Sequence, residues 1–337
     1  MKHIYTNVEA INPKEWLELT EVSPTATWFQ TEAAYHFYER QPEIMHPFVV
    51  AVGRPETHRL AGVMVGYITH EKNAVKQFFS RRAIVIGGPT LRDDITTEEL
   101  QNLLMNAAMI VNDQRAIYIE TRNFHSFEPW KETFEACDFH YQPHMNFHID
   151  TSSINIVEEN LGKSRKRDIR TSFRDGTTII EQPTLEQVKA WYEILQHLYK
   201  TKIKTPLFPF SFFENLWQHK DGRLLLVALG GEIIGGTACV ALEGKCLYEW
   251  FVCGRDGEWK TVFPSSVATY AGIRYAAEHS MPRFDMMGAG TPDEAYGVRD
   301  FKARFGGKEV EHGRFLNVLS APMYNIGKLG VKILKRR

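Results

Sequence analysis

The sequence is poor in cysteine and has no long apolar run. Its four cysteines are Cys137, Cys239, Cys246 and Cys253; none forms a C-x-x-C pair, and the last three fall in segments with a strand pattern. We therefore expect buried thiols and neither disulfides nor a metal site. No stretch approaches the roughly 18 apolar residues of a membrane-spanning helix, and residues 1–16 lack the apolar core of a signal peptide. These absences predict a cytoplasmic protein.

The sequence also has no excess of either charge, since it contains 40 Lys and Arg residues and 41 Asp and Glu residues, for a net charge of -1. Proteins that coat nucleic acid without sequence preference are usually basic overall, so this balance disfavours that class. The chain does have an ordinary globular composition, with 43% apolar and 24% charged residues. That composition excludes disordered, collagen-like and coiled-coil proteins, and the length of 337 residues suggests about two domains.

Strand patterns dominate the first half of the chain. The runs are rich in Val, Ile and Tyr and are bounded by polar turns. Thr96 and Glu99 form a capping box, after which apolar residues recur at helical spacing as far as Gln114. The sequence thus predicts a helix near residues 13–19, a helix from the capping box to Gln114, and four strands, at residues 47–53, 59–69, 82–88 and 116–120.

The second half repeats this order. A helix is expected from Pro264 to about Ala277, and strands are expected at 224–229, 232–242, 245–254 and 284–287. The repeat predicts two similar α/β units, each an antiparallel meander followed by a helix and a further strand. We place an N-terminal domain at residues 1–148, a C-terminal domain at 149–320 and a basic tail at 321–337.

A single helix is expected over residues 156–174, with Asn155 as a loose cap and Gly176 at its end. Four cations spaced along one face of this helix form what we call the basic stripe: Lys163, Arg167, Arg170 and Arg174. Between Lys163 and Arg174, only Asp168 is available to offset them. The stripe is either a solvated helix face or a binding surface for phosphate or carboxylate.

The segment 284–315 carries the most candidate site residues. A strand runs into Gly288-Ala-Gly290, and a polar loop follows. The Gly-x-Gly alone is a weak signal, because no third glycine opens a helix as in a dinucleotide-binding loop. Three histidines could share one face of an extended segment, but Pro143 interrupts the run and no metal site is expected there: His140, His144 and His148.

Lys302 is the least ordinary cation of that segment. It lies between Phe301 and Phe305. Apolar neighbours would desolvate its ammonium and strengthen its field on a bound anion or carbonyl. The alternative is a surface ion pair of Lys302 with Asp300 or Glu294.

Residues 284–306 resemble the C-terminal signature of the FemABX family. The shared residues are Phe284-Asp285, Gly288, Pro292, Tyr296-Gly297, Phe301-Lys302 and Phe305-Gly306. Residues 82–94, 145–150 and 163–174 fit the same resemblance. FemABX proteins are peptidoglycan interpeptide-bridge aminoacyltransferases. The resemblance therefore implies an α/β (α+β) fold of two tandem GNAT-like (acetyltransferase-like) domains, each with a mixed, largely antiparallel sheet flanked by helices.

The resemblance also implies a reaction, in which an amine of a peptidoglycan-precursor stem peptide attacks the ester carbonyl of an aminoacyl-tRNA. The ester is already activated, so no metal or other cofactor is implied, and the site has to position both substrates and stabilise the oxyanion. Lys302 would be the catalytic residue. The implied substrate-binding residues are Arg167 and Arg170, for the phosphates of a nucleotide- or lipid-linked muropeptide, together with Phe301, Tyr248, Tyr296 and Arg299.

Two features known from such proteins are missing. No sustained heptads occur that could form the coiled-coil arm that contacts tRNA in some family members. The GNAT loop for acyl-CoA is also missing, because residues 257–266 (GEWKTVFPSS) occupy its place, and Trp259 and Pro264 suit a pyrophosphate poorly. Two alternatives stay open: an N-acyltransferase that uses acyl-CoA or another donor on a different amine, and a binding protein of the same fold without activity.

The last ten residues, 328–337 (KLGVKILKRR), mix basic and apolar side chains. We expect weak attraction to anionic membranes, of at most about 1 kcal/mol per basic residue near the surface. This contact would bring the protein to the inner membrane surface. The alternative is a frayed tail with no partner.

Overall fold

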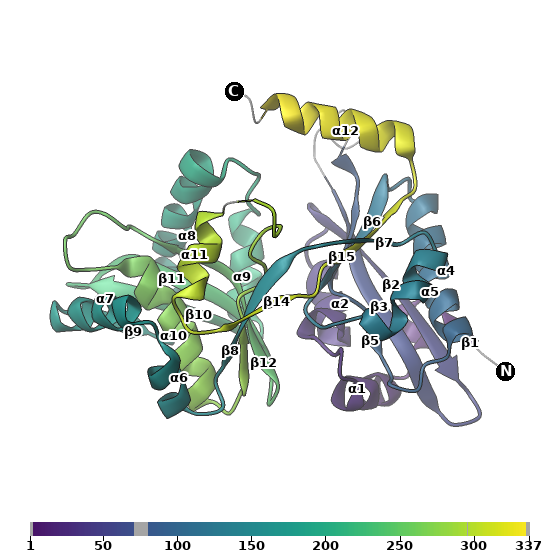
Figure 1. Ribbon diagram of the computed structural model, residues 1–337, viewed down its shortest axis with the longest axis horizontal. Helices are drawn as coiled ribbons and strands as arrows, with labels where there is room; N and C mark the ends of the chain where they lie inside the picture. The colour runs from purple at the N-terminus through teal and green to yellow at the C-terminus, as the bar shows by residue number, and fades with distance from the viewer. Residues whose placement is uncertain (1–2, 71–79, 295, 335–337) are drawn as a thin grey trace. The chain divides into compact units, whose positions relative to one another are not determined.

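The computed structural model describes residues 3–70, 80–294 and 296–334. The chain divides into two compact units. Unit 1 comprises Met1–His144 together with Glu311–Arg337, and unit 2 comprises Met145–Val310. Figure 1 shows both units as a β-sheet covered by helices.

Unit 1 is built on an eight-stranded sheet with the order β1-β2-β3-β4-β6-β15-β7, in which β5 pairs only with β3. Its strands are β1 (His3–Tyr5), β2 (Met45–Arg54), β3 (Arg59–Thr69), β4 (Ala83–Gly87), β5 (Thr90–Leu91), β6 (Tyr118–Asn123), β7 (His140–Gln142) and β15 (Arg314–Val318). Its helices are α1 (Pro13–Val22), α2 (Glu32–Glu39), α4 (Thr97–Asp113), α5 (Lys131–Ala136) and α12 (Ala321–Leu334), with short turns η1 (Val8–Ala10), η2 (Trp28–Gln30) and η3 (Glu128–Trp130). All pairs between neighbouring strands are antiparallel except β4 with β6.

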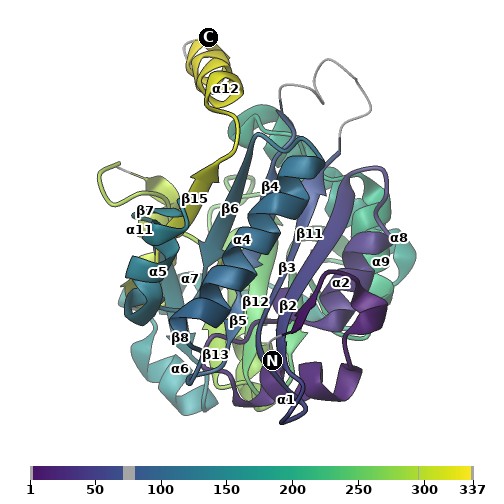
Figure 2. The same ribbon diagram turned by 90° about the vertical axis from the view of Figure 1, so that its right-hand side faces the viewer.

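Helix α4 covers one face of the first sheet, as Figure 2 shows. The Thr96 side chain caps its N-terminus, and the Glu99 side chain completes the capping box, as the sequence predicts. The helix buries one apolar face against β2 and β3: Leu100, Leu103, Leu104, Ala107 and Val111. This packing forms the core of unit 1.

Unit 2 is built on a seven-stranded sheet with the order β14-β8-β13-β12-β11-β10-β9. Its strands are β8 (Met145–Asp150), β9 (Thr177–Ile180), β10 (Gly222–Leu229), β11 (Glu232–Leu242), β12 (Cys246–Gly254), β13 (Arg283–Asp285) and β14 (Lys308–Glu311). Its helices are α6 (Ile154–Asn160), α7 (Lys163–Arg174), α8 (Leu185–Leu198), η4 (Tyr199–Ile203), α9 (Phe210–Gln218), α10 (Pro264–Glu278) and α11 (Gly297–Ala303). Within the described part of this sheet, β12 and β13 form a parallel pair.

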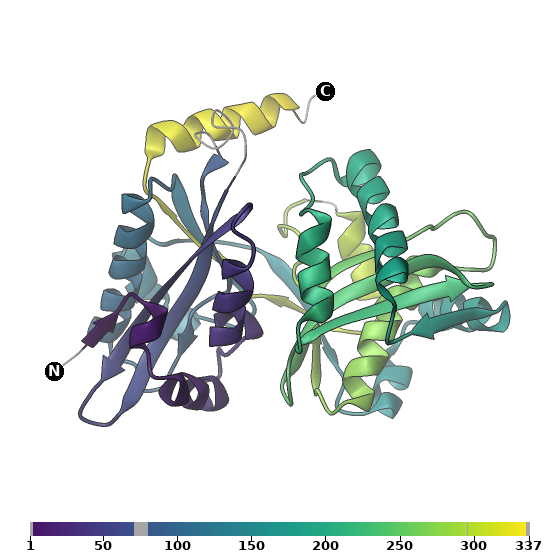
Figure 3. The same ribbon diagram turned by 180° about the vertical axis from the view of Figure 1, so that it is seen from behind.

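Helices cover both faces of the second sheet. Neighbouring glycines of β11 mark the two faces: a Cβ on Gly235 would meet Pro264 of α10, whereas a Cβ on Gly236 would meet Trp191 of α8. Figure 3 shows α8 and α9, in teal, on their side of the sheet, and Figure 1 shows α10. Both sheets are thus mixed, largely antiparallel and flanked by helices, as the sequence predicts.

The single helix expected over residues 156–174 is wrong, because the structure has two helices there. Ser153, and not Asn155, caps α6, while Leu161 and Gly162 are extended and separate α6 from α7. The Gly162 amide donates to the Arg304 carbonyl oxygen at 3.0 Å, and a Cβ on Gly162 would lie 2.8 Å from that oxygen. The helix therefore breaks where the end of α11 packs against its backbone.

The C-terminal part of the chain also differs from the expected division. After β14 the chain returns to unit 1, and β15 inserts between β6 and β7. Residues 311–320 therefore belong with the first sheet and not with the second. Residues 321–334 form α12 and not a frayed tail, and residues 335–337 lie outside the described residues.

The cysteines are free thiols, and Cys239, Cys246 and Cys253 are buried in strands as predicted. None of the described helices has the length and apolar character needed to cross a membrane.

Candidate functional site

The candidate site lies where β12 and β13 separate in unit 2. The two strands pair only at Leu247 with Phe284 and at Tyr248 with Asp285. Beyond this point β12 continues to Gly254, while the chain leaves β13 after Asp285. The register against β11 also shifts here, so that Trp250 is an extra residue between Glu249 and Phe251. The carboxyl ends of parallel strands, where the sheet opens, are a common place for ligands in α/β folds.

Lys302 of α11 reaches into this opening and is buried. Its Nζ donates to the carbonyl oxygen of Gly288 at 2.7 Å and to that of Met286. Burial lowers the pKa of Lys302, while Glu249 and Asp285 act in the opposite direction. The ammonium therefore belongs to a buried charge cluster, and not to a surface pair with Asp300 or Glu294.

Asp285, the last residue of β13, is the best-supported carboxylate of the cluster. Asn146 Nδ2 and the Met287 amide each donate to its Oδ1 at 2.8 Å, and His148 Nε2 lies 3.0 Å from its Oδ2. Burial works to raise the pKa of Asp285, but His148, Asn146 and Arg283 outweigh it and the pKa is lowered. Asp285 is therefore held as an anion.

Glu249 is the second buried carboxylate, and it behaves differently. Thr237 Oγ1 donates to its Oε1 at 3.5 Å. Burial raises the pKa of Glu249, although Lys302, Thr269 and Thr237 act against the rise. A carboxylate with a raised pKa holds a proton more readily than an ordinary glutamate, which suits a group that accepts a proton and returns it.

Sequence reasoning missed Glu249 and Asn146, considered His148 only as a metal ligand, and gave Asp285 no role. A signal was present, because Glu249 is the one charged residue in the otherwise apolar strand β12. The three histidines of the expected extended segment do not converge. His140 pairs with Glu135, His144 accepts from Arg314, and His148 pairs with Asp285.

The loop between β13 and α11 is held by Arg299. Its guanidinium donates to the carbonyl oxygens of Ala289 at 3.0 Å and Pro292 at 3.2 Å, and also to that of Thr291. These bonds support a loop in which Met287 and two glycines have positive φ angles. Arg299 thus fixes the backbone that accepts hydrogen bonds from Lys302.

Phe301 is half-buried and packs against Phe305, with ring centroids 5.3 Å apart. The cation over these two rings is Arg165 of α7, whose Cζ lies 4.5 Å from each centroid. Arg165 also donates to the Phe301 carbonyl oxygen at 3.3 Å and to Ser266 Oγ. The sequence places Lys302 between these rings, whereas the structure places Arg165 over them and directs Lys302 Nζ to the carbonyl oxygens of Met286 and Gly288.

The basic stripe lies on the exposed face of α7. The Arg167 side chain is 72% exposed, with Nη2 3.4 Å from Asp168 Oδ1, and Arg174 pairs with Asp175 at 3.0 Å. Among the described residues, no ion pair is found for Lys163 or Arg170, both of which are exposed. The structure therefore forms the stripe as expected but does not bring Arg167 or Arg170 into the Lys302 cluster.

The two tyrosines of the expected site have opposite environments. Tyr248 is fully buried in β12, and burial raises its pKa well above the ordinary value, so its ring offers no surface to a ligand. Tyr296 is 44% exposed on the loop before α11. The side chains of Tyr296 and Tyr199 lie close enough for their charges to interact.

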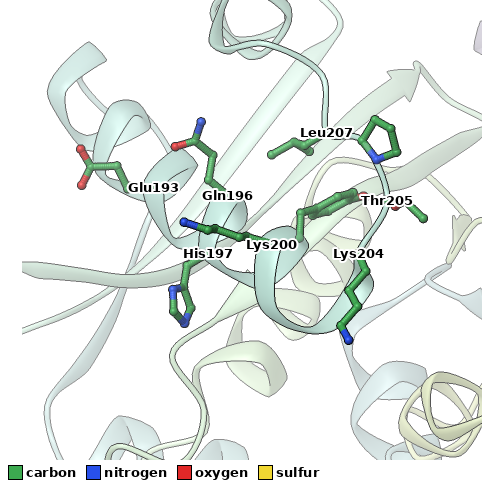
Figure 4. A pocket seen from close by; sticks show the side chains of 9 residues that line it. Glu193, Gln196, His197, Lys200, Lys204, Thr205 and Leu207 are labelled. Carbon is green, nitrogen blue, oxygen red and sulfur yellow. The ribbon is translucent and has the colours of Figure 1, made fainter. Parts of the chain in front are cut away.

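Next to Tyr199 the surface of unit 2 holds an open pocket of about 740 Å³. Figure 4 shows its walls, which come from the end of α8, from η4 and from the segment that follows: Glu193, Gln196, His197, Lys200, Lys204, Thr205 and Leu207. Two lysines and one glutamate among these residues give it a basic character. Tyr199, which is close enough to Tyr296 to interact with it, belongs to the lining of this pocket.

The N-terminus of α10, where an acyl-CoA pyrophosphate would bind, has its amides in use. Pro264 has no amide hydrogen, and the Ser265 amide donates to Asp256 Oδ1 at 3.0 Å. The Ser266 and Val267 amides donate to the Phe263 carbonyl oxygen at 3.0 Å. An anion at this helix end would have to displace the Asp256 carboxylate.

Comparison with known proteins identifies this architecture. Residues 163–302 match the family model of the acetyltransferase (GNAT) domain. The crystal structure of FemX superposes on the chain with a TM-score of 0.72 at 15% identity, over 97% of this chain and 99% of that one. The chain has a FemABX-like tandem GNAT fold.

Two further solved structures share the tandem GNAT fold. A tandem GNAT protein from the clavulanic acid biosynthesis pathway has a TM-score of 0.59 at 10% identity, over 95% of this chain and 99% of that one. The C-terminal domain of a putative lysylphosphatidylglycerol synthetase from Agrobacterium fabrum has a TM-score of 0.57 at 13% identity, over 94% and 97%. No curated protein matches the chain in sequence. Unit 2 thus contains an acyltransferase domain of the GNAT type, in agreement with the sequence prediction.

Proposed function

We propose that unit 2 transfers an aminoacyl group from an activated ester to an amine of a peptidoglycan-precursor stem peptide. The observation that carries the proposal is the buried cluster of Lys302, Glu249 and Asp285 at the open end of the β12–β13 pair. A cation with a lowered pKa beside a carboxylate with a raised pKa supplies the two groups that such a transfer needs.

Each residue of the cluster has a distinct task in this reaction. The amine nitrogen attacks the ester carbonyl carbon, and the Lys302 ammonium stabilises the oxyanion that forms. Glu249 accepts the proton that the amine loses and returns it to the departing oxygen as the carbon–oxygen bond breaks. Asp285 holds the end of β13 and, together with Glu249, favours the charged form of Lys302 against the effect of burial.

The donor that fits best is an aminoacyl ester such as aminoacyl-tRNA. At the start of α10 the Asp256 carboxylate occupies the position where GNAT proteins hold the pyrophosphate of acyl-CoA. The pocket with Lys200 and Lys204 gives a phosphate-bearing donor a basic surface near Tyr296. The GNAT domain match keeps an N-acyltransferase that uses acyl-CoA as the second candidate.

The acceptor would be a nucleotide- or lipid-linked muropeptide, whose phosphates suit the basic stripe. Arg167 and Arg170 are exposed on the same face of α7, and Arg170 pairs with no described carboxylate. One guanidinium group can donate two hydrogen bonds to two oxygens of the same phosphate, so two arginines suit a diphosphate.

Lys302→Met tests the catalytic assignment, because methionine keeps the length of the side chain and removes its charge. Removal of one oxyanion-stabilising group typically slows turnover by on the order of 10²–10³. We expect a loss of that size in aminoacyl transfer, with a smaller change in the affinity for a nucleotide-linked muropeptide measured by calorimetry. Lys189→Met, at an exposed position of α8, is the matched control.

Normal turnover by Lys302→Met would contradict the catalytic role and favour a binding protein. The same calorimeter distinguishes the donors. Affinity for acetyl-CoA, without affinity for the muropeptide, would replace the proposed function with the acyl-CoA alternative.

A further inference from the structure

Unit 1 has a cluster of arginines that the proposed function does not use. Side chains alternate along β6, so that Ile119 faces the core beneath α4 while Glu120 and Arg122 share the opposite face of the sheet. In the neighbouring strand β15, Arg314 lies directly opposite Arg122 in the register. Two like charges in opposing positions destabilise a sheet unless another group compensates them.

Glu120 compensates only part of this charge. Its Oε1 accepts from Arg122 Nε at 2.7 Å and from Arg314 Nη1 at 3.2 Å, so one carboxylate oxygen serves both arginines. The other terminal nitrogen of Arg314 lies 2.9 Å from His144 Nε2. A third arginine, Arg82, is close enough to interact with Glu120 as well. Three guanidinium groups and one carboxylate leave a net charge of about +2 on this face.

The cluster is accessible and adjoins a pocket. The side chains of Arg122 and Arg314 are 37% and 26% exposed, whereas that of Glu120 is 12% exposed. Arg82 also lines a pocket of about 350 Å³ with Tyr118, which precedes Glu120 by two positions on the same face of β6. The other walls come mainly from α12 and are partly apolar: Met323, Tyr324, Gly327 and Lys328.

We propose that Arg82, Arg122 and Arg314 form a binding site in unit 1 for the phosphate group of an organic phosphate. The net charge of about +2 matches a phosphate dianion and exceeds what a carboxylate or sulfonate monoanion would neutralise. The adjoining pocket, with the rings of Tyr118 and Tyr324, accommodates a partly apolar body attached to that phosphate. This site is independent of the Lys302 cluster and of the basic stripe, both of which belong to unit 2.

The test is calorimetric titration of the full chain with phenyl phosphate at low salt, with benzenesulfonate as a monoanionic comparison. We expect phenyl phosphate to bind and benzenesulfonate to bind at least about tenfold more weakly. Arg314→Gln should weaken phenyl phosphate binding by about ten- to a hundredfold, as for the loss of one charge-assisted hydrogen bond. Arg314→Gln leaves the Glu120–Arg122 pair intact. If Arg314→Gln does not fold, Arg82→Gln, at an exposed position, takes its place in the test.

Glu120→Gln separates a binding role from a structural one. It removes the compensating negative charge, so phenyl phosphate should bind more tightly than to the parent protein even if the variant is less stable. Arg59→Gln, an exposed arginine at the start of β3, should leave the affinity unchanged. Weaker binding by Glu120→Gln, or unchanged affinity in Arg314→Gln, would overturn the proposal.

Arg170→Gln in unit 2 tests whether phenyl phosphate binds at the basic stripe instead. Loss of phenyl phosphate binding in this variant, with normal binding by Arg314→Gln, would assign the phosphate to the basic stripe and would also overturn the proposal. Aminoacyl transfer by any of these variants is a separate measurement, so failure of the proposed function and failure of this site can be distinguished.

Discussion

The two units have the same order of elements around the parallel pair of strands, but they differ at the end of that pair. In unit 1, β4 and β6 pair over five positions, from Ala83 with Ile119 to Gly87 with Asn123. In unit 2, the corresponding strands β12 and β13 pair at two positions and then separate. Helix α4 connects the pair in unit 1, and α10 connects it in unit 2.

The space beyond the pair is filled differently in the two units. In unit 1 the chain turns through Gly87 and Gly88, both with positive φ, and added Cβ atoms there would collide with Thr27 and Phe127 respectively. In unit 2 the same place holds Lys302 and its carboxylates. One topology can therefore close its sheet with tight packing or open it and bury charges, and in this chain the candidate site lies at the open end.

Among the substitutions that test this comparison, Asp285→Ala should have the largest effect on the free energy of unfolding. The variant removes the acceptor of Asn146, the Met287 amide and His148 and leaves Lys302 with less compensation. Loss of one partner from a buried charge group typically costs about 3–5 kcal/mol. We expect a decrease of that size in the free energy of unfolding measured with urea.

Asp113→Ala, at an exposed position near the end of α4, is the control and should change stability by less than about 0.5 kcal/mol. Equal stability of the two variants would show that the opening in unit 2 does not depend on its buried charges.

Gly87→Ala tests the closed end in unit 1. The added Cβ would lie 2.3 Å from Thr27 Oγ1, at a φ of +87°. Backbone strain and overpacking together should lower the unfolding free energy by about 3 kcal/mol. Gly230→Ala has a φ of +57° but nothing within 4 Å of the added atom, so it should cost about 1 kcal/mol. If the two substitutions cost the same, the close approach to Thr27 contributes nothing.

Glu99→Gln tests α4, the helix that connects the two strands of the closed pair. Arg54 donates to Glu99 and lowers the pKa of that carboxyl from 4.5 to about 2. A carboxyl whose pKa is lower in the folded state stabilises the fold at any pH above the pKa that it has in the unfolded chain. This stabilisation is lost as pH falls from about 4.5 toward 2. Glu99→Gln should cost about 2 kcal/mol at neutral pH and flatten the acid limb of the stability curve.

Glu98, the exposed residue next to Glu99, gives the control for this pH dependence. Glu98→Gln removes the same charge from the same turn of α4 without removing an acceptor of Arg54, so urea titrations between pH 2 and 5 should show a smaller change in the acid limb than for Glu99→Gln. An identical acid limb in Glu99→Gln and the parent would mean that the pair with Arg54 does not contribute.

Sequence patterns predict the helices and strands of this fold better than they predict the contacts between distant residues. The strands at 59–69 and 232–242 and the capped helix after Thr96 are correct because local periodicity and capping determine them. The break at Gly162 and the insertion of β15 into the first sheet depend on contacts between distant residues, which local patterns do not contain.

The same limit applies to the candidate site. Lys302 is recognisable because two aromatic residues surround it in the sequence, but the carboxylates that act on it come from two other elements, the strands β12 and β13. Only the fold shows that Glu249 and Asp285 lie beside its ammonium and that Arg165 covers Phe301 and Phe305. The roles expected for Arg167, Arg170, Phe301 and Tyr296 and the membrane contact of the C-terminal segment stay predictions.

The insertion of β15 between β6 and β7 has a consequence for synthesis on the ribosome. The first sheet cannot be completed until residues 314–318 have emerged, although β6 and β7 are made long before. During that interval the edges of β6 and β7 have unpaired backbone groups, which are prone to pair with other chains. Unit 2 lies entirely within the intervening segment and can fold first. The unit made second would therefore reach its native state before the unit made first.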